Sequence, residues 1–233
     1  MGENVMIKNI LLDMDNTILD FTRAERVAAS KALAAMGIQP TDELLKRYHE
    51  INEDQWRLFE LGELEREQVK VRRYELLFDE MGIDASPRET AKVYEGLLGI
   101  GHYFMDGAVE LLETLSSEYR LYLATNGTSN VQKSRISSAG ISKYFHGIYI
   151  SEDVGYNKPD IRYFEACFKD IPSFIREETV MIGDSLTSDI KGGINAGIKT
   201  VWFNHEGKSR DDSIVPDYEI RSLGEIPELM KRI

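Results

Sequence analysis

The sequence predicts an α/β protein whose core is a Rossmann-like, doubly wound parallel sheet with an inserted all-helical domain. Short apolar runs alternate with helix-like segments in the second half of the chain, which is typical of strand–helix–strand units around a parallel sheet. Residues 22–98 show helical patterning almost throughout. We therefore expect residues 1–20 and 101–233 to form the α/β core, and residues 21–100 to form a helical insertion after the first strand.

The expected strands share a short length and a high content of apolar and β-branched residues. The first, about Ile7–Leu12, precedes the helical stretch and belongs by type with the later ones. The later candidates begin only after the segment "GIGHYFMDG". They are "LYLAT" (121–125), "GIYI" (147–150), "TVMIG" (179–183) and "TVWF" (200–203).

The helices are marked by their ends. "MGI" at 36–38 and 81–83 and "AGI" at 139–141 and 196–198 each follow a stretch with helical patterning. Glycine accepts the left-handed conformation after a helix, and the following isoleucine can pack back onto the last turn. The segment "SPRE" at 86–89 offers an N-cap serine, a proline in the first turn and a glutamate that completes a capping box. These signals predict four helix ends and one helix start.

The composition limits the function classes. The net charge is −12, which opposes binding to nucleic-acid backbones but permits a small phosphorylated substrate where a cation and a local Lys or Arg offset the repulsion. No run is apolar for long enough to cross a bilayer, and the start lacks an apolar signal-peptide centre. The single cysteine, Cys167, is typical of a reducing compartment. We expect a cytoplasmic protein that binds neither nucleic-acid polymers nor membranes; the sequence leaves its oligomeric state open.

Aspartates gather where two of the expected strands end. Asp13 and Asp15 follow the first strand, Asp184 follows "TVMIG", and Asp189 stands five positions on, where it could orient its neighbours or cap a helix. Two nearby aspartates in a loop are more often solvated or capping residues, but the carboxyl ends of parallel strands share one edge of a sheet. Two carboxylates ~4 Å apart repel each other by about 4 kcal/mol at an effective dielectric constant of ~20. A divalent cation would offset this repulsion, and an oxygen-rich site favours Mg²⁺, whereas the four scattered histidines argue against zinc.

Two further strand ends carry groups suited to phosphate. Thr125 and Asn126 end the second strand just before a helix that begins near Ser129, and helix N-termini with small polar donors hold phosphate. Lys158 follows the third apolar run. A lone lysine is usually a surface charge, but here Pro159 fixes its backbone. Its position at a strand end makes a functional role a competing interpretation.

Taken in order, "DMDNT", "TNG", "KPD" and "GDSLTSD" resemble the four motifs of the haloacid dehalogenase superfamily. The resemblance covers the whole chain, because the helical insertion is similar to the family's cap. It implies a Mg²⁺-dependent phosphomonoester hydrolase that acts through an aspartyl-phosphate on a small phosphorylated substrate. Segments such as "INEDQWRLFELGEL" and "ISEDVGYNKPD" are similar to house-cleaning pyrimidine 5′-nucleotidases, which act on nucleoside monophosphates, including noncanonical ones.

The resemblance also implies a role for each motif residue. Asp13 would attack phosphorus, and Asp15 would protonate the leaving alkoxide and later activate water. Asp13, Asp184 and the backbone carbonyl of Asp15 would hold Mg²⁺. The phosphoryl group would be bound by the remaining motif residues: Thr125, Asn126 and Lys158, of which Lys158 would also offset charge on the nucleophile.

The sequence leaves several alternative functions open. Dehalogenases of the superfamily need no acid at the position of Asp15, because halide leaves without a proton, so Asp15 favours phosphoryl transfer. A sugar-phosphate phosphatase or a phosphomutase fits the same motifs. A phosphorylation-responsive signalling module also gathers aspartates and a lysine, but such modules lack a long helical insertion after the first strand. An inactivated scaffold would lack some of the motif residues, all of which are present.

Overall fold

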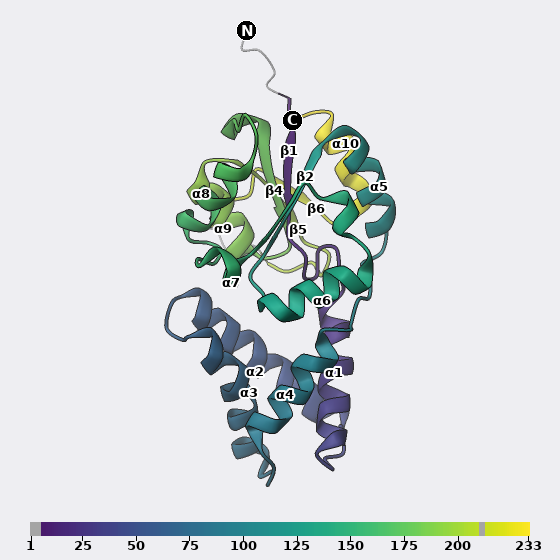
Figure 1. Ribbon diagram of the computed structural model, residues 1–233, viewed down its shortest axis with the longest axis vertical. Helices are drawn as coiled ribbons and strands as arrows, with labels where there is room; N and C mark the ends of the chain where they lie inside the picture. The colour runs from purple at the N-terminus through teal and green to yellow at the C-terminus, as the bar shows by residue number, and fades with distance from the viewer. Residues whose placement is uncertain (1–5, 210–212) are drawn as a thin grey trace. The chain divides into compact units, whose positions relative to one another are not determined.

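The structure is a computed structural model that describes residues 6–209 and 213–233 (Figure 1). Residues 1–5, which carry part of the expectation about export, lie outside the described residues. The chain divides into two compact units. One consists of Met1–Asp20, Phe104–Ser129 and Gly140–Ile233, and the other of Phe21–Tyr103 and Asn130–Ala139. The division into a catalytic core and a cap stays a prediction, and Asn130–Ala139 was not expected to group with the helical insertion.

The first unit contains a six-stranded, all-parallel sheet in the order β3-β2-β1-β4-β5-β6, which confirms the predicted fold class. Five of its strands are those expected from the sequence. The short sixth strand escaped prediction because three residues, "YEI", give no readable pattern. The strands are β1 (Asn9–Leu12), β2 (Arg120–Thr125), β3 (Gly147–Ile150), β4 (Thr179–Gly183), β5 (Lys199–Phe203) and β6 (Tyr218–Ile220).

The register of the sheet brings distant segments to one edge. β1 lies between β2 and β4, and Leu12 pairs with Leu123 on one side and Ile182 on the other. The ladder continues for one residue, since the backbone N–H of Asp13 donates to the carbonyl of Ile182 at 2.9 Å. The residues that follow these strands therefore meet at the carboxyl edge.

Helices cover both faces of the sheet, as expected for strands that are buried on both sides. Figure 1 shows α8 and α9 on one side of the strands and α5 and α10 on the other. A cluster around Tyr163 and Phe164 packs α8 against Leu11 and Met181 of the sheet. The helices of this unit are α5 (Ala108–Glu118), α7 (Ser151–Val154), α8 (Ile161–Asp170), α9 (Lys191–Ala196) and α10 (Ile226–Met230); α6 (Ser129–Ala139) belongs mainly to the second unit.

The second unit contains the helical insertion. Its own core includes Tyr48, Tyr74, Leu77 and Tyr94, all buried. The four predicted helix ends, two in each unit or at its boundary, are confirmed by left-handed backbone at Gly37, Gly82, Gly140 and Gly197. Ser86 caps its helix as expected. No helix in residues 6–209 and 213–233 has both the length and the apolar content needed to cross a membrane. The four insertion helices are α1 (Phe21–Ala35), α2 (Asp42–Glu60), α3 (Arg66–Met81) and α4 (Pro87–Leu98).

Replacing Leu77 with alanine should destabilise the helical unit, because Leu77 is fully buried in its core. The loss of buried methyl groups and the cavity left behind should lower the free energy of unfolding by about 2–5 kcal/mol, measured by urea denaturation. Leu61→Ala is the matched control, since Leu61 is 58% exposed and should cost less than about 0.5 kcal/mol. Equal losses in the two variants would contradict this assignment of the core.

Candidate active site

A buried lysine lies at the centre of the carboxyl edge. The Nζ atom of Lys158 donates to Asp13 Oδ1 at 2.7 Å, to Asp189 Oδ1 at 2.6 Å and to the carbonyl of Ala124 at 2.7 Å. These three acceptors match the three donors of an ammonium group. Lys158 is 1% exposed, so the surface-charge interpretation is wrong for this lysine. Its charge is buried together with the carboxylates that compensate it.

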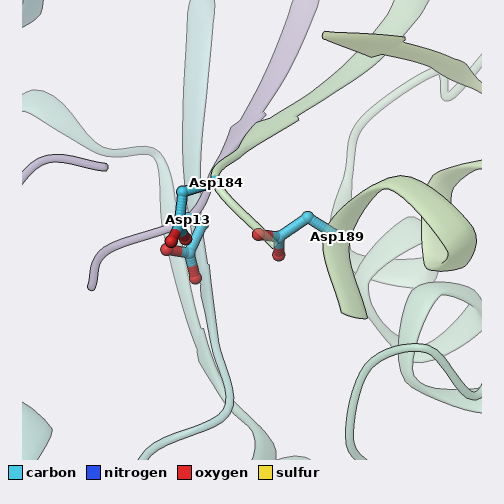
Figure 2. A group of neighbouring side chains, drawn as sticks. All are labelled: Asp13, Asp184 and Asp189. Carbon is cyan, nitrogen blue, oxygen red and sulfur yellow. The ribbon is translucent and has the colours of Figure 1, made fainter. Parts of the chain in front are cut away.

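Three carboxyl groups converge beside this lysine. Asp13, Asp184 and Asp189 each offer an oxygen, and these oxygens all lie within 4.8 Å of one another. Figure 2 shows Asp13 and Asp184 at the ends of adjacent strands, while Asp189 reaches toward them from the helical segment that follows β4. Three carboxylates against the charge of one lysine leave an excess of negative charge. An oxygen-only group of this kind could hold a divalent cation such as Mg²⁺.

Burial and mutual repulsion perturb the acids. Burial raises the pKa of Asp13 to about 7, with Lys158 opposing the shift and Asp189 and Asp15 adding to it. The pKa of Asp184 is likewise raised well above the usual range, by burial and by its proximity to Asp13 and Asp189. For Lys158, burial lowers the pKa, but Asp13 and Asp189 outweigh it, so the pKa lies above its usual value and the amine is charged. Perturbed carboxyl groups in such a cluster are typical of functional sites.

The segment after β1 makes a compact turn that carries Asp15. The amides of Ile18 and Leu19 both donate to the carbonyl of Met14, and Asn16 adopts a positive φ of 57°. Asn tolerates this left-handed conformation better than most residues do. Asp15 is partly exposed, whereas Asp13 is buried. The side chain of Asp15 does not belong to the three-carboxylate group, and its predicted role in metal binding rests on its backbone carbonyl.

The phosphate-binding candidates follow β2. Thr125 is buried at the end of that strand, and α6 begins at Ser129, where the sequence places it. The side chain of Asn126 turns toward the segment that carries Lys158: its Nδ2 donates to the carbonyl of Lys158 at 2.9 Å, and its Oδ1 accepts from the N–H of Lys158 at 2.8 Å. Binding of a phosphoryl group by Thr125 and Asn126 stays a prediction.

The two carboxylate oxygens of Asp189 accept hydrogen bonds from two different residues. Besides bonding Lys158, Asp189 accepts from the backbone N–H of Ser185 at 3.1 Å, which closes the loop after β4. A Cβ atom at Gly183 would collide with this carboxylate, so only glycine leaves room for it. The structure thus favours the orienting role of Asp189 over simple helix capping.

Sequence reasoning missed two groups at the site. The carbonyl of Ala124 is the third acceptor for Lys158, and Trp202 of β5 donates its indole N–H to the carbonyl of Asp184 at 2.8 Å. Backbone carbonyls carry no sequence signal, and the apolar run "TVWF" indicated only a strand. Trp202 is 1% exposed, so it restrains the Asp184 backbone from within the core.

Comparison with known proteins agrees with this geometry. A family model described as haloacid dehalogenase-like hydrolase matches residues 10–203. The protein YfnB from Bacillus subtilis, which is named as a HAD-hydrolase, is 39% identical over 96% of this chain and 95% of its own. A magnesium-bound crystal structure of YfnB superimposes with a TM-score of 0.93 over 97% of this chain and 99% of that one, and its description reports interdomain movement.

Two further relatives carry names that state a substrate. The pyrimidine 5′-nucleotidase PynA from Streptococcus pneumoniae is 34% identical over 97% of this chain and 95% of its own. The pyrimidine 5′-nucleotidase YjjG from Escherichia coli is 27% identical over 95% of this chain and 96% of its own. These matches run along nearly the whole chain, so they include the helical insertion as well as the motifs.

The pH dependence of stability should reveal the raised carboxyl pKa values. Aspartate in an unfolded chain has a pKa of ~3.9, whereas burial raises the pKa of Asp13 in the metal-free fold to about 7. Between these values the folded protein holds a proton that the unfolded chain has lost, so the free energy of unfolding should fall as the pH rises from about 4 to 7. Asp184, whose pKa is also raised, acts with the same sign.

Magnesium should reverse this loss, because a cation binds the deprotonated carboxylates of the folded state. Thermal melts at pH 5 and pH 8, with chelator and with Mg²⁺, should show a larger Mg²⁺-induced rise in Tm at pH 8. Asp13→Asn should diminish the difference between the two pH values, because it removes one of the titrating ligands. An equal rise at both pH values in the wild-type protein would contradict the assignment.

Proposed function

The chain belongs to the haloacid dehalogenase-like hydrolase family, and we propose that it is a Mg²⁺-dependent phosphomonoester hydrolase, a 5′-nucleotidase acting on pyrimidine nucleoside monophosphates. The observation that carries the proposal is the meeting of Asp13, Lys158 and Asp184 at one edge of the sheet. These residues come from three separate segments of the chain. The names of PynA and YjjG support the substrate class.

Asp13 is the proposed nucleophile. Its carboxylate attacks phosphorus, a bond forms between Asp13 and the phosphoryl group, and the bond from phosphorus to the ester oxygen breaks. Lys158, 2.7 Å from Asp13, favours the ionised form of the attacking group and so opposes the effect of burial on its pKa. Thr125, at the end of the neighbouring strand β2, and the backbone N–H of Asn126 hold the phosphoryl oxygens.

Asp15 is the proposed acid and base. It gives a proton to the leaving alkoxide, which ends the first step with Asp15 deprotonated. The same carboxylate then takes a proton from the water that hydrolyses the aspartyl-phosphate. Its partial exposure at the turn after β1 suits a group that must exchange protons with a bound alcohol and with water.

The acidic cluster fits magnesium, since its oxygens lie within 4.8 Å of one another and its negative charge exceeds that of Lys158. Asp13, Asp184 and the backbone carbonyl of Asp15 are the proposed ligands. When bound, Mg²⁺ supplies the positive charge that allows an anionic carboxylate to approach an anionic phosphate ester. Asp189 contributes by orienting Lys158.

Asp13→Asn should abolish release of phosphate from an aryl phosphate, by about 1,000-fold or more, because the amide cannot act as the nucleophile. Circular dichroism should show that the variant is folded. Asp170→Asn removes the same charge from an exposed position at the end of α8 and should retain wild-type turnover. Unaltered turnover by Asp13→Asn would end the mechanistic proposal.

The substrate class needs a separate test. With Mg²⁺ present, kcat/KM for pyrimidine nucleoside 5′-monophosphates should exceed that for sugar phosphates by about tenfold or more, because specificity arises from differential transition-state binding. Chelator should suppress all turnover. A preference for sugar phosphates would replace the nucleotidase assignment with a sugar-phosphate phosphatase. Conversion of one sugar phosphate into its isomer, without phosphate release, would identify a phosphomutase.

A further inference from the structure

We infer that the side chain of Asn126 is a positioning residue, which holds the backbone of Lys158 in place and acts on the reaction through that lysine. The inference deepens the proposed hydrolysis and rests on it. The side-chain amide of Asn126 forms two hydrogen bonds with Lys158, one to its carbonyl at 2.9 Å and one from its N–H at 2.8 Å. Both amide heteroatoms are therefore engaged by the same residue.

The position of Lys158 must be accurate because its ammonium group is buried. It contacts Asp13, Asp189 and the Ala124 carbonyl at 2.6–2.7 Å, and it is 1% exposed. A displaced lysine would leave buried carboxylates without their compensating charge, which is costly in a low-dielectric site. The backbone of Lys158 lies in the irregular segment between α7 and α8, where no strand ladder fixes it. The Asn126 amide supplies that restraint.

A second set of contacts ties the same two segments together. The backbone N–H of Ser129 donates to Glu152 at 2.6 Å, and its hydroxyl donates to Asp153 at 2.8 Å. The segment after β2 is thus joined to the segment after β3 at both ends, by Ser129 at one and Asn126 at the other. The carbonyl of Lys158 also accepts a longer bond, 3.3 Å, from Asn157. The two segments form one structural piece that carries both Thr125 and Lys158.

A double-mutant cycle separates this role from direct contact with the phosphoryl group. Asn126→Ala and Lys158→Met are made singly and together, and kcat and KM for an aryl phosphate are measured with Mg²⁺. Asn126→Ala should lower kcat by about 10–100-fold, as expected for a misplaced catalytic group, and should change KM by less than about threefold. In the Lys158→Met background the same substitution should cost less than about twofold, because the residue through which it acts is gone.

Binding of inorganic phosphate provides a readout that does not require turnover. Titration calorimetry with Mg²⁺ in the Lys158→Met background should give the same Kd with Asn126 and with alanine at that position. If the Asn126 side chain instead bound the phosphoryl group, its loss would weaken phosphate binding about tenfold in both backgrounds and would overturn the inference. Absence of aryl phosphate turnover in the wild-type protein would count against the proposed function, while the phosphate titration would still decide the role of Asn126.

Two further variants test whether a loss of activity comes from the Asn126 contacts and not from a general disturbance of the structure. Asn195→Ala removes one exposed side-chain bond to the carbonyl of Pro159, 3.2 Å long, and should leave kcat within about twofold of wild type. Asn126→Asp preserves the size of the side chain and the bond from the Lys158 N–H, but loses the donor to the Lys158 carbonyl. In the Lys158→Met background Asn126→Asp should also have no further effect on kcat, and an additive loss there would overturn the inference.

Discussion

The buried ammonium group of Lys158 is the contact on which the arrangement of the site depends. It lies between Asp13 and Asp189 and also donates to the Ala124 carbonyl, so it links the ends of β1 and β2 with the helical segment after β4. Each of these acceptors would be costly to bury alone, and the ammonium would be costly to bury without them. Lys158 therefore stabilises Asp13 and Asp189 as buried carboxylates at the edge of the sheet.

This compensation is incomplete, and the residual negative charge accounts for the chemistry that the site can perform. The pKa values of Asp13 and Asp184 are raised first by burial, and the repulsion between neighbouring carboxylates adds to that effect. A divalent cation would remove this repulsion. The excess negative charge that destabilises the metal-free fold thus provides the affinity for a cation. Stability and catalysis are therefore coupled, because both depend on the same carboxylates.

Three residues support the site by fixing the positions of its charged groups. Gly183 leaves space for the Asp189 carboxylate, Trp202 restrains the Asp184 backbone, and Asn126 holds the backbone of Lys158. Each acts through a neighbour and not by contact with the cluster of carboxylate oxygens. Such supports explain how loops at the end of a sheet can hold charged groups in fixed positions.

The sequence by itself determined the strands β1 to β5, the four glycine-terminated helix ends and the acids at the ends of β1 and β4, because apolar patterning and left-handed glycines act over a few neighbouring residues. Only the tertiary structure decided which groups face one another. Asn126 meets Lys158 across 32 positions, Lys158 meets Asp13 across 145, and α6 groups with the helical unit. Such contacts depend on strand order and side-chain packing. The three-residue β6 likewise forms only because β5 offers a free edge beside it.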